Sequence, residues 1–278
     1  GSHWAPFYTD YGVTLQRRFF DHFLKGQDTG WDKQPRVLLQ VRHPGEKFVE
    51  RGENEWPLAR TQWTAFHLDP DGMRLSPTPP SKAGTLTYDG LGDGVTFSTP
   101  PLAQETEITG PIALKLALSS STTDADVFAI LRVFDPAGKE VTFQGALDPH
   151  TPIAQGWLRA SHRKLDPARS LPYRPYHTHD EKQPLVPGEV YALDVEIWPT
   201  CIVVPAGWRV ALTLRGKDYE HDGAAATLSN MKNPMKGCGP FTHDDEEDRP
   251  PAVFGGKVTL HFGGAHASNV LLPIVPKR

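Results

Sequence analysis

Hydrophobic residues recur at helical spacing in one long stretch near the start of the chain. In residues 13–25, four apolar side chains repeat every three to four positions and polar residues occupy the other faces: Leu15, Phe19, Phe23 and Leu24. Gly26 then stands where a glycine commonly ends a helix. The pattern predicts an amphipathic helix over 13–25. Its aromatic face would be exposed if the helix stood alone, so it needs a packing partner.

From residue 35 onward the pattern changes to short apolar runs separated by Gly, Pro and Asp. The runs are "PRVLLQVRH", "TQWTAFHL", "GTLTYDG", "GVTFSTPP", "GPIALKLALSS", "ADVFAILRVFDPAGKEV", "EVYALDVEIWP", "TCIVVPAGWRVALTLRG" and "GKVTLHFGG". Within "VFDPAGKEV", Pro136 and Gly138 are typical turn residues. Many short strands without intervening helices predict a mainly β fold, an antiparallel sandwich of the jelly-roll type.

Two segments do not fit this strand pattern. Residues 161–187 combine several prolines with charged residues and tyrosines, which predicts a long, ordered surface loop. Residues 217–252 contain no clear strand and carry the acidic run "HDDEED" at 243–248. That run lacks the Gly-punctuated spacing of a calcium loop, so it is interpreted as a solvated acidic loop.

Composition and charge exclude several classes of protein. The 278 residues are 38% hydrophobic and 22% charged, as expected for a globular chain with a core. The formal charge of −4 argues against binding to nucleic acid or to an anionic membrane. No apolar run approaches the roughly 20 residues that cross a bilayer, and no signal peptide is visible. The two cysteines, Cys201 and Cys238, are expected to be free thiols, which favours a cytoplasmic protein.

The sequence contains no nucleophile in a recognisable setting. The G-x-S-x-G elbow of α/β-hydrolases is absent, and neither the serines at 119–121 nor Ser268 has the flanking glycines of that turn. The chain is therefore expected to lack a nucleophile of its own. No cofactor motif is present either, and no cofactor is expected.

One short motif raises the question of a metal. In "HTHD", His177 and His179 stand two residues apart beside Asp180, a spacing that can share a zinc or copper ion. The alternative is a polar loop, and no further ligand at a characteristic spacing supports the metal. We therefore expect no metal site, and a surface hydrogen-bonding role for the two histidines.

Seven tryptophans keep a second class of function open. They could line a sugar-binding platform on a free-standing carbohydrate-binding sandwich. Most of them stand within or beside predicted strands, where core packing is the usual role. The aromatic face of residues 15–24 argues against a free-standing binding module, because such a module would leave this face without a packing partner.

Several of these segments, in their order, resemble one family. "LQRRFFDHFLKG", "ENEWPLARTQWTAFHL", "DADVFAILRVFDPAGKEV", "GWLRASHR", "LVPGEVYALDVEIWPTCIVVPAGWRVALTL" and "HASNVLLPIVP" are similar to the C-terminal part of the cocaine esterase-like and X-prolyl dipeptidyl-peptidase (CocE/NonD) family of serine hydrolases. In that family a jelly roll (galactose-binding-like) follows an α/β-hydrolase domain. The resemblance implies that residues 1–34 are the last helix and loop of the hydrolase domain, and that residues 35–278 are the jelly roll.

The resemblance also implies a catalytic role for one residue of this chain. In the family the triad histidine stands in the loop before the last helix, and His3 occupies that place. The sequence "GSH" is also what a cleaved affinity tag leaves, so both origins of His3 stay open. The nucleophile and its acid would lie upstream, in a hydrolase domain or partner chain that carries the Ser and the Asp.

The function expected from the resemblance is that of one region of a larger enzyme. The whole enzyme would cleave acyl ester or X-Pro amide bonds, and its substrate would be a small-molecule ester or a peptide. The present chain would pack against the hydrolase domain, shape its pocket and support a homo-oligomer. Alone, it is expected to dimerise through residues 13–25, because a two-fold contact buries the same patch twice.

Overall fold

The computed structural model describes residues 5–227, 234–240 and 242–277 of the chain. It contains short 3₁₀ helices at Ala5–Tyr8 (η1), Trp31–Lys33 (η2) and Ala160–His162 (η3), and α-helices at Asp10–Lys25 (α1) and Pro251–Phe254 (α2). The strands are β1 (Val37–His43), β2 (Lys47–Glu53), β3 (Gln62–Asp69), β4 (Arg74–Ser76), β5 (Gly84–Asp89), β6 (Val95–Ser98), β7 (Thr106–Ser120), β8 (Asp126–Phe134), β9 (Ala154–Arg159), β10 (Tyr191–Val204), β11 (Arg209–Arg215), β12 (Lys257–Phe262) and β13 (Asn269–Val275). The predicted mainly β fold is confirmed.

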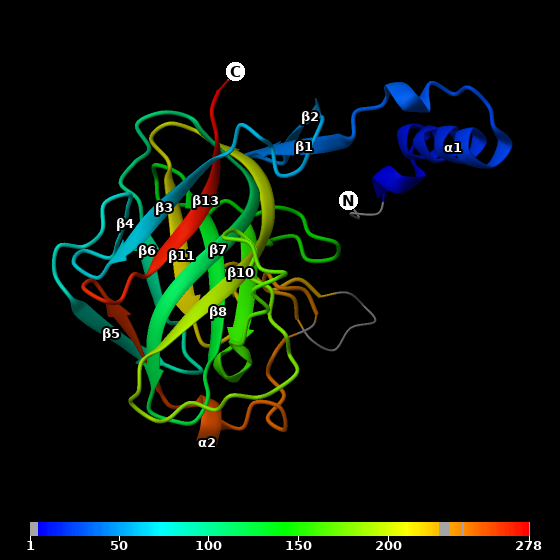
Figure 1. Cartoon of the computed structure of the whole chain (residues 1–278). Helices are drawn as coiled ribbons and strands as arrows, with labels where there is room; N and C mark the ends of the chain where they lie inside the picture. The colour runs from blue at the N-terminus through cyan, green and yellow to red at the C-terminus, as the bar shows by residue number, and fades with distance from the viewer. Residues whose placement is uncertain (1–4, 228–233, 241, 278) are drawn as a thin grey trace.

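The strands form one curled sheet that folds over on itself as a sandwich (Figure 1). Their order is β2-β1-β10-β7-β13-β3-β4-β6-β11-β8-β9, with β12 pairing to β5 and β7. Most pairs are antiparallel, and the exceptions among the named pairs are β1 with β10 and β4 with β6. The long strand β7 bonds to β10, β12 and β13, so it forms the centre of the sheet.

A glycine allows β9 to lie close to β10. A Cβ atom at Gly156 would lie 1.9 Å from the carbonyl oxygen of Glu196, closer than real Cβ contacts come. Only glycine therefore fits at this approach of the two strands.

The core lies between the two layers of the sandwich. Its fully buried side chains include Phe97, Ile108, Leu114, Leu131 and Phe262. Strand β8 is buried on nearly every residue, rather than on alternate ones. Its second face is covered because Tyr219, from the irregular segment after β11, packs on Phe128 and Ile130.

Helix α1 lies apart from the sandwich, beyond the β1–β2 hairpin (Figure 1). It begins at Asp10, three residues before the predicted start, because the Thr9 hydroxyl accepts a hydrogen bond from the Gly12 amide as a helix cap. It ends at Gly26 in the left-handed conformation, with φ of 64°, as the sequence predicts. None of its residues is buried.

Candidate functional site

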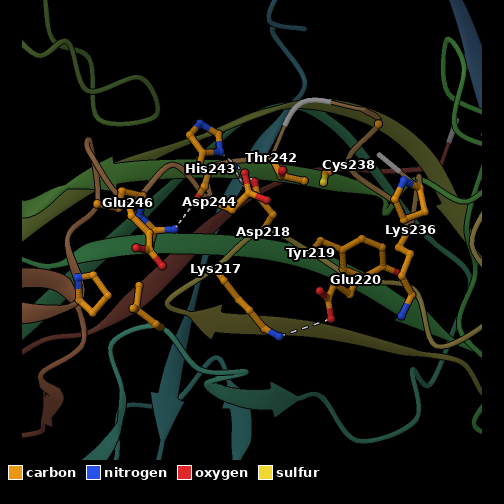
Figure 2. A pocket seen from close by; sticks show the side chains of 15 residues that line it. Lys217, Asp218, Tyr219, Glu220, Lys236, Cys238, Thr242, His243, Asp244 and Glu246 are labelled. Carbon is orange, nitrogen blue, oxygen red and sulfur yellow. Dashed lines mark hydrogen bonds and ion pairs between the residues drawn. The ribbon is translucent and has the colours of Figure 1, made fainter. Parts of the chain in front are cut away.

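A hollow of about 430 Å³ opens beside the loops that follow β11 (Figure 2). Apart from Leu91, its lining comes from two stretches, 217–220 and 234–251, in the region where the sequence predicts no strand. Charged side chains of both signs line it: Lys217, Asp218, Glu220, Lys236, Asp244, Glu246 and Arg249.

Two buried carboxylates fix these loops to the sandwich. Asp148, 2% exposed, accepts hydrogen bonds from the backbone amides of Gly237 at 2.6 Å and Gly239 at 3.1 Å. Asp126, in β8, accepts from Nε of Arg249 at 2.8 Å. An irregular segment can therefore hold a defined shape, because its backbone groups and charges find buried partners.

An aspartate–histidine pair stands at one side of the hollow. Nδ1 of His243 lies 2.9 Å from Oδ1 of Asp218, and the His243 backbone amide donates to Oδ2 at 2.6 Å. The hydrogen bond to Asp218 raises the pKa of His243 above its usual value. Burial works to raise the pKa of Asp218, but the hydrogen bonds from His243 outweigh it and hold that pKa low. Both shifts favour the charged forms of the two side chains.

Cys238 lines the same hollow, so a thiol, an imidazole and a carboxylate occur together. In Figure 2 the Cys238 sulfur lies on the other side of Asp218 from the His243 ring. Burial, with the negative charges of Asp218 and Asp148, raises the pKa of Cys238 to about 12. A nucleophilic cysteine needs the opposite shift. The surroundings of Cys238 therefore work against a thiolate nucleophile.

The Cys238 thiol is expected to resist alkylation in the folded chain. With a pKa of about 12, its thiolate fraction at pH 8 is roughly a thousandfold below that of an ordinary thiol with a pKa of about 8.5. Iodoacetamide with peptide mass spectrometry measures the rate, and the same chain in urea supplies the control. Modification of native Cys238 as fast as in urea would contradict the electrostatic argument.

The serines singled out in the sequence have structural roles. Ser119 Oγ lies 2.9 Å from Nε2 of His261, but Ser119 is only 7% exposed. Ser268 Oγ donates to the His261 carbonyl at 3.0 Å and accepts from the Ala117 amide at 3.2 Å. Both hydroxyls join neighbouring strands and segments of the sheet. Both cysteines are free, as predicted.

The "HTHD" loop is ordered, and its histidines contact a residue outside the loop motif. Nδ1 of His179 lies 3.1 Å from Nδ1 of His162, at the end of η3. The ring of His177 lies beside that of His179, with 5.9 Å between centroids. The predicted hydrogen bonding is confirmed for His179, whereas Nε2 of His177 is buried without a hydrogen-bond partner. Sequence reasoning missed His162, which stands 17 residues away from its partner.

The acidic run 243–248 does not gather around a common point. Asp248 pairs with Arg159 at 2.9 Å, and Asp245 accepts from the Glu247 amide at 2.9 Å. Within the described ranges no group of three or more His, Cys, Asp or Glu side chains is placed to hold a metal ion.

Two of the exposed tryptophans, Trp157 and Trp198, do not form a flat platform. Trp157 and Trp198 are 38% and 57% exposed, and their rings lie 5.2 Å apart but are tilted by 51°. The rings of Trp63 and Tyr173 stack with their centroids 4.4 Å apart, so one face of Trp63 is covered by the chain itself. The geometry gives the carbohydrate-binding reading no specific support.

The aromatic face of α1 is largely exposed. Phe19 and Phe23 are 41% and 58% exposed, although Trp31 folds back onto them with ring centroids 5.2 and 6.3 Å away. Phe20 and Leu24 are 51% and 76% exposed. The predicted need for a packing partner therefore remains, because the chain's own segments cover only a fraction of this face.

Two further expectations concern His3 and membrane-spanning segments. His3, the candidate triad base, lies outside the described residues. In the part of the chain that the structure describes, no helix is long and apolar enough to cross a membrane.

Comparisons with known proteins give a consistent result. The family model described as the X-Pro dipeptidyl-peptidase C-terminal non-catalytic domain matches residues 29–271. A putative serine esterase of Mycobacterium bovis is 26% identical over 93% of this chain and 40% of its own length. The cocaine esterase of Rhodococcus sp. is 23% identical over 95% of this chain and 46% of its own length.

A solved structure extends the likeness to the whole fold. A CocE/NonD family hydrolase from Staphylococcus aureus superposes with a TM-score of 0.85 at 26% identity, over 98% of this chain and 47% of that one. The chain thus spans less than half the length of these relatives.

Proposed function

Since the chain belongs to the X-Pro dipeptidyl-peptidase C-terminal non-catalytic domain family, we propose that it is the C-terminal region of a serine hydrolase that cleaves acyl ester or X-Pro amide bonds. The names of the relatives, a putative serine esterase and a cocaine esterase, support an acyl-transfer reaction for the whole enzyme. The nucleophile and its acid then belong to an N-terminal catalytic domain, and the substrate is a small ester or a peptide.

One observation carries this proposal: within the described chain only Trp31 packs on the aromatic face of α1, and most of that face stays exposed. Its aromatic side chains are between 41% and 58% exposed, and the helix lies away from the sandwich. A catalytic domain preceding α1 would cover that face. We accordingly divide the chain into 1–34, the end of the hydrolase domain, and 35–278, the jelly roll.

The same surface suggests what the region does for the enzyme. By packing on the catalytic domain it would exclude water from the apolar face and form one wall of the substrate pocket. Where the catalytic domain is missing, the face would bury itself against a second copy of the chain, which is the simplest route to a homo-oligomer.

His3 is proposed as the base of the catalytic triad, from its family position alone. It would accept the proton of the serine hydroxyl and pass it to the leaving group. This role places the catalytic histidine on the segment that leads into α1, so packing of α1 would also position the base.

Activity measurements test the proposal. Purified 1–278 is expected to show no turnover of p-nitrophenyl esters or X-Pro anilides, and no labelling by a fluorophosphonate. The enzyme that includes the catalytic domain should be labelled at one serine, and His3→Gln there should lower kcat by at least about 10³-fold. Stoichiometric labelling of a serine in 1–278, lost in Ser119→Ala, would overturn the proposal.

A further inference from the structure

A second hollow, of about 540 Å³, lies where the β1–β2 hairpin meets β10 and the segment that leads into β9. We call it the Arg42 hollow. Its volume is within the range typical of sites for small molecules. Among the described residues that line it, Arg42 carries the only formal charge. Four of the other lining side chains are aromatic: Phe48, Trp56, Phe143 and Trp198.

The guanidinium of Arg42 is held in a defined orientation. Its Nη2 donates to the Ile153 carbonyl at 2.8 Å and to the Thr200 hydroxyl, and its Nε donates to the Cys201 carbonyl at 3.4 Å. Its Cζ lies 4.7 Å from the centroid of the Phe143 ring. Within the described ranges of the chain, Nη1 donates to no acceptor. Two N–H groups of a fixed side chain therefore remain available to a ligand.

The charge of Arg42 is not matched by a carboxylate in direct contact. Glu46 attracts it through space, but Oε1 of Glu46 accepts from the Gln144 amide at 2.6 Å. Arg132, by contrast, pairs with Glu140 at 2.6 Å. Burial lowers the pKa of Arg42 below its usual value, so the cost of removing this charge from water is not fully offset. An anion at Nη1 would offset it.

The aromatic side chains give the hollow an apolar wall. Strand β10 has an irregular register between Ile197 and Thr200, and such a bulge redirects the side chains within it. Trp198 lies in this bulge and is 57% exposed, while Phe48 and Trp56 are 47% and 40% exposed. Three large rings thus remain accessible beside a single positive charge. Flat apolar ligands pack well on such rings.

We propose that the Arg42 hollow binds a small aromatic carboxylate, with its negative charge at Nη1 of Arg42 and its ring against Trp56 and Trp198. One guanidinium with two available N–H groups matches one carboxylate, and the apolar wall accommodates the ring. Bound ligand would connect β1 to β10 and raise the thermal midpoint of the chain. Because the named groups all belong to this chain, binding does not depend on the catalytic domain of the proposed function.

Calorimetric titration of the purified chain with 3-phenylpropionate tests this proposal. The neutral 3-phenylpropionamide has the same ring without the charge, and propionate has the charge without the ring. Arg42→Gln removes the guanidinium, and Trp198→Ala removes an exposed ring with little effect on the fold. Arg36→Gln is the matched control, because Arg36 is exposed and does not line the hollow. Circular dichroism verifies the fold of each variant.

The expected result is one saturable site for 3-phenylpropionate in the wild-type chain, with a Kd below about 1 mM. The amide and propionate should each bind at least about tenfold more weakly, as should 3-phenylpropionate to Arg42→Gln. Trp198→Ala should weaken binding at least about threefold, whereas Arg36→Gln should bind like the wild type.

Three results would overturn the proposal. They are no saturable binding to the wild-type chain, equal affinity for the acid and its amide, and wild-type affinity in Trp198→Ala. The comparison of acid with amide uses the wild-type chain alone, so it decides the role of the charge even if Arg42→Gln does not fold.

Discussion

Replacing Asp126 by alanine is expected to lower the free energy of unfolding by about 3–5 kcal/mol, the usual cost of removing one partner of a buried ion pair. Asp126 is 6% exposed and accepts hydrogen bonds from two arginines, Arg159 at 2.9 and 3.0 Å and Arg249 at 2.8 Å. Because the Arg249 side chain is itself only 5% exposed, its charge would remain buried and unpaired. Urea unfolding measures the change.

The chain contains a matched control for this experiment. Asp248 also pairs with Arg159, at 2.9 Å, but its side chain is 62% exposed. Asp248→Ala should therefore cost no more than about 1 kcal/mol, as exposed ion pairs do. Equal losses in the two variants would contradict the claim that burial, and not pairing alone, decides the effect.

A second result is expected for the hollow at His243. Arg249 joins Asp126 to the backbone of the loops, through hydrogen bonds to the carbonyls of Gly216 and His243. Loss of Asp126 should therefore loosen the 243–250 segment before it unfolds the sandwich. Hydrogen exchange would show this as faster exchange at the amide of His243, which donates to Asp218 in the native chain.

The sequence predicts local features of this fold well, because they depend on neighbouring residues. Gly26 marks the end of α1, and the short apolar runs correspond to strands. Helix α1 begins three residues before the predicted start, because the Thr9 side chain, which is outside the apolar pattern, caps it. The continuous burial of β8 also has a tertiary cause, since Tyr219 covers its second face.

The site contacts could not be predicted, because they join distant parts of irregular segments. Asp218 and His243 are 25 residues apart, and His162 and His179 are 17 apart, with no repeated spacing to link them. The pattern "HTHD" was a sufficient signal for His179, but its partner depends on how the loop folds back. Side-chain periodicity carries no information about such a return.

The second large effect is expected at the exposed face of α1. Phe23 is 58% exposed in this chain, so Phe23→Asp should leave the fold of the sandwich intact. Against a catalytic domain the same ring would be buried, where a phenylalanine contributes about 1.5–3 kcal/mol and an unpaired carboxylate adds a further penalty. The affinity for the catalytic domain should fall at least about a hundredfold.

Thr14→Asp is the control for Phe23→Asp, because nine residues at 3.6 per turn place the two positions on opposite sides of the helix. Both changes introduce one carboxylate into α1, and Thr14 is exposed. A difference between the two variants therefore reports on the face of the helix and not on its charge.

The most direct test of the account is sedimentation velocity of this chain mixed with the separately expressed catalytic domain of the same protein. We expect the wild-type chain and Thr14→Asp to sediment with the catalytic domain as a one-to-one complex at micromolar concentration. Phe23→Asp should sediment separately, while circular dichroism of the variant alone shows that its sandwich is folded. Failure of the wild-type chain to associate, or unchanged association of Phe23→Asp, would contradict the claim that α1 docks this non-catalytic region onto a hydrolase.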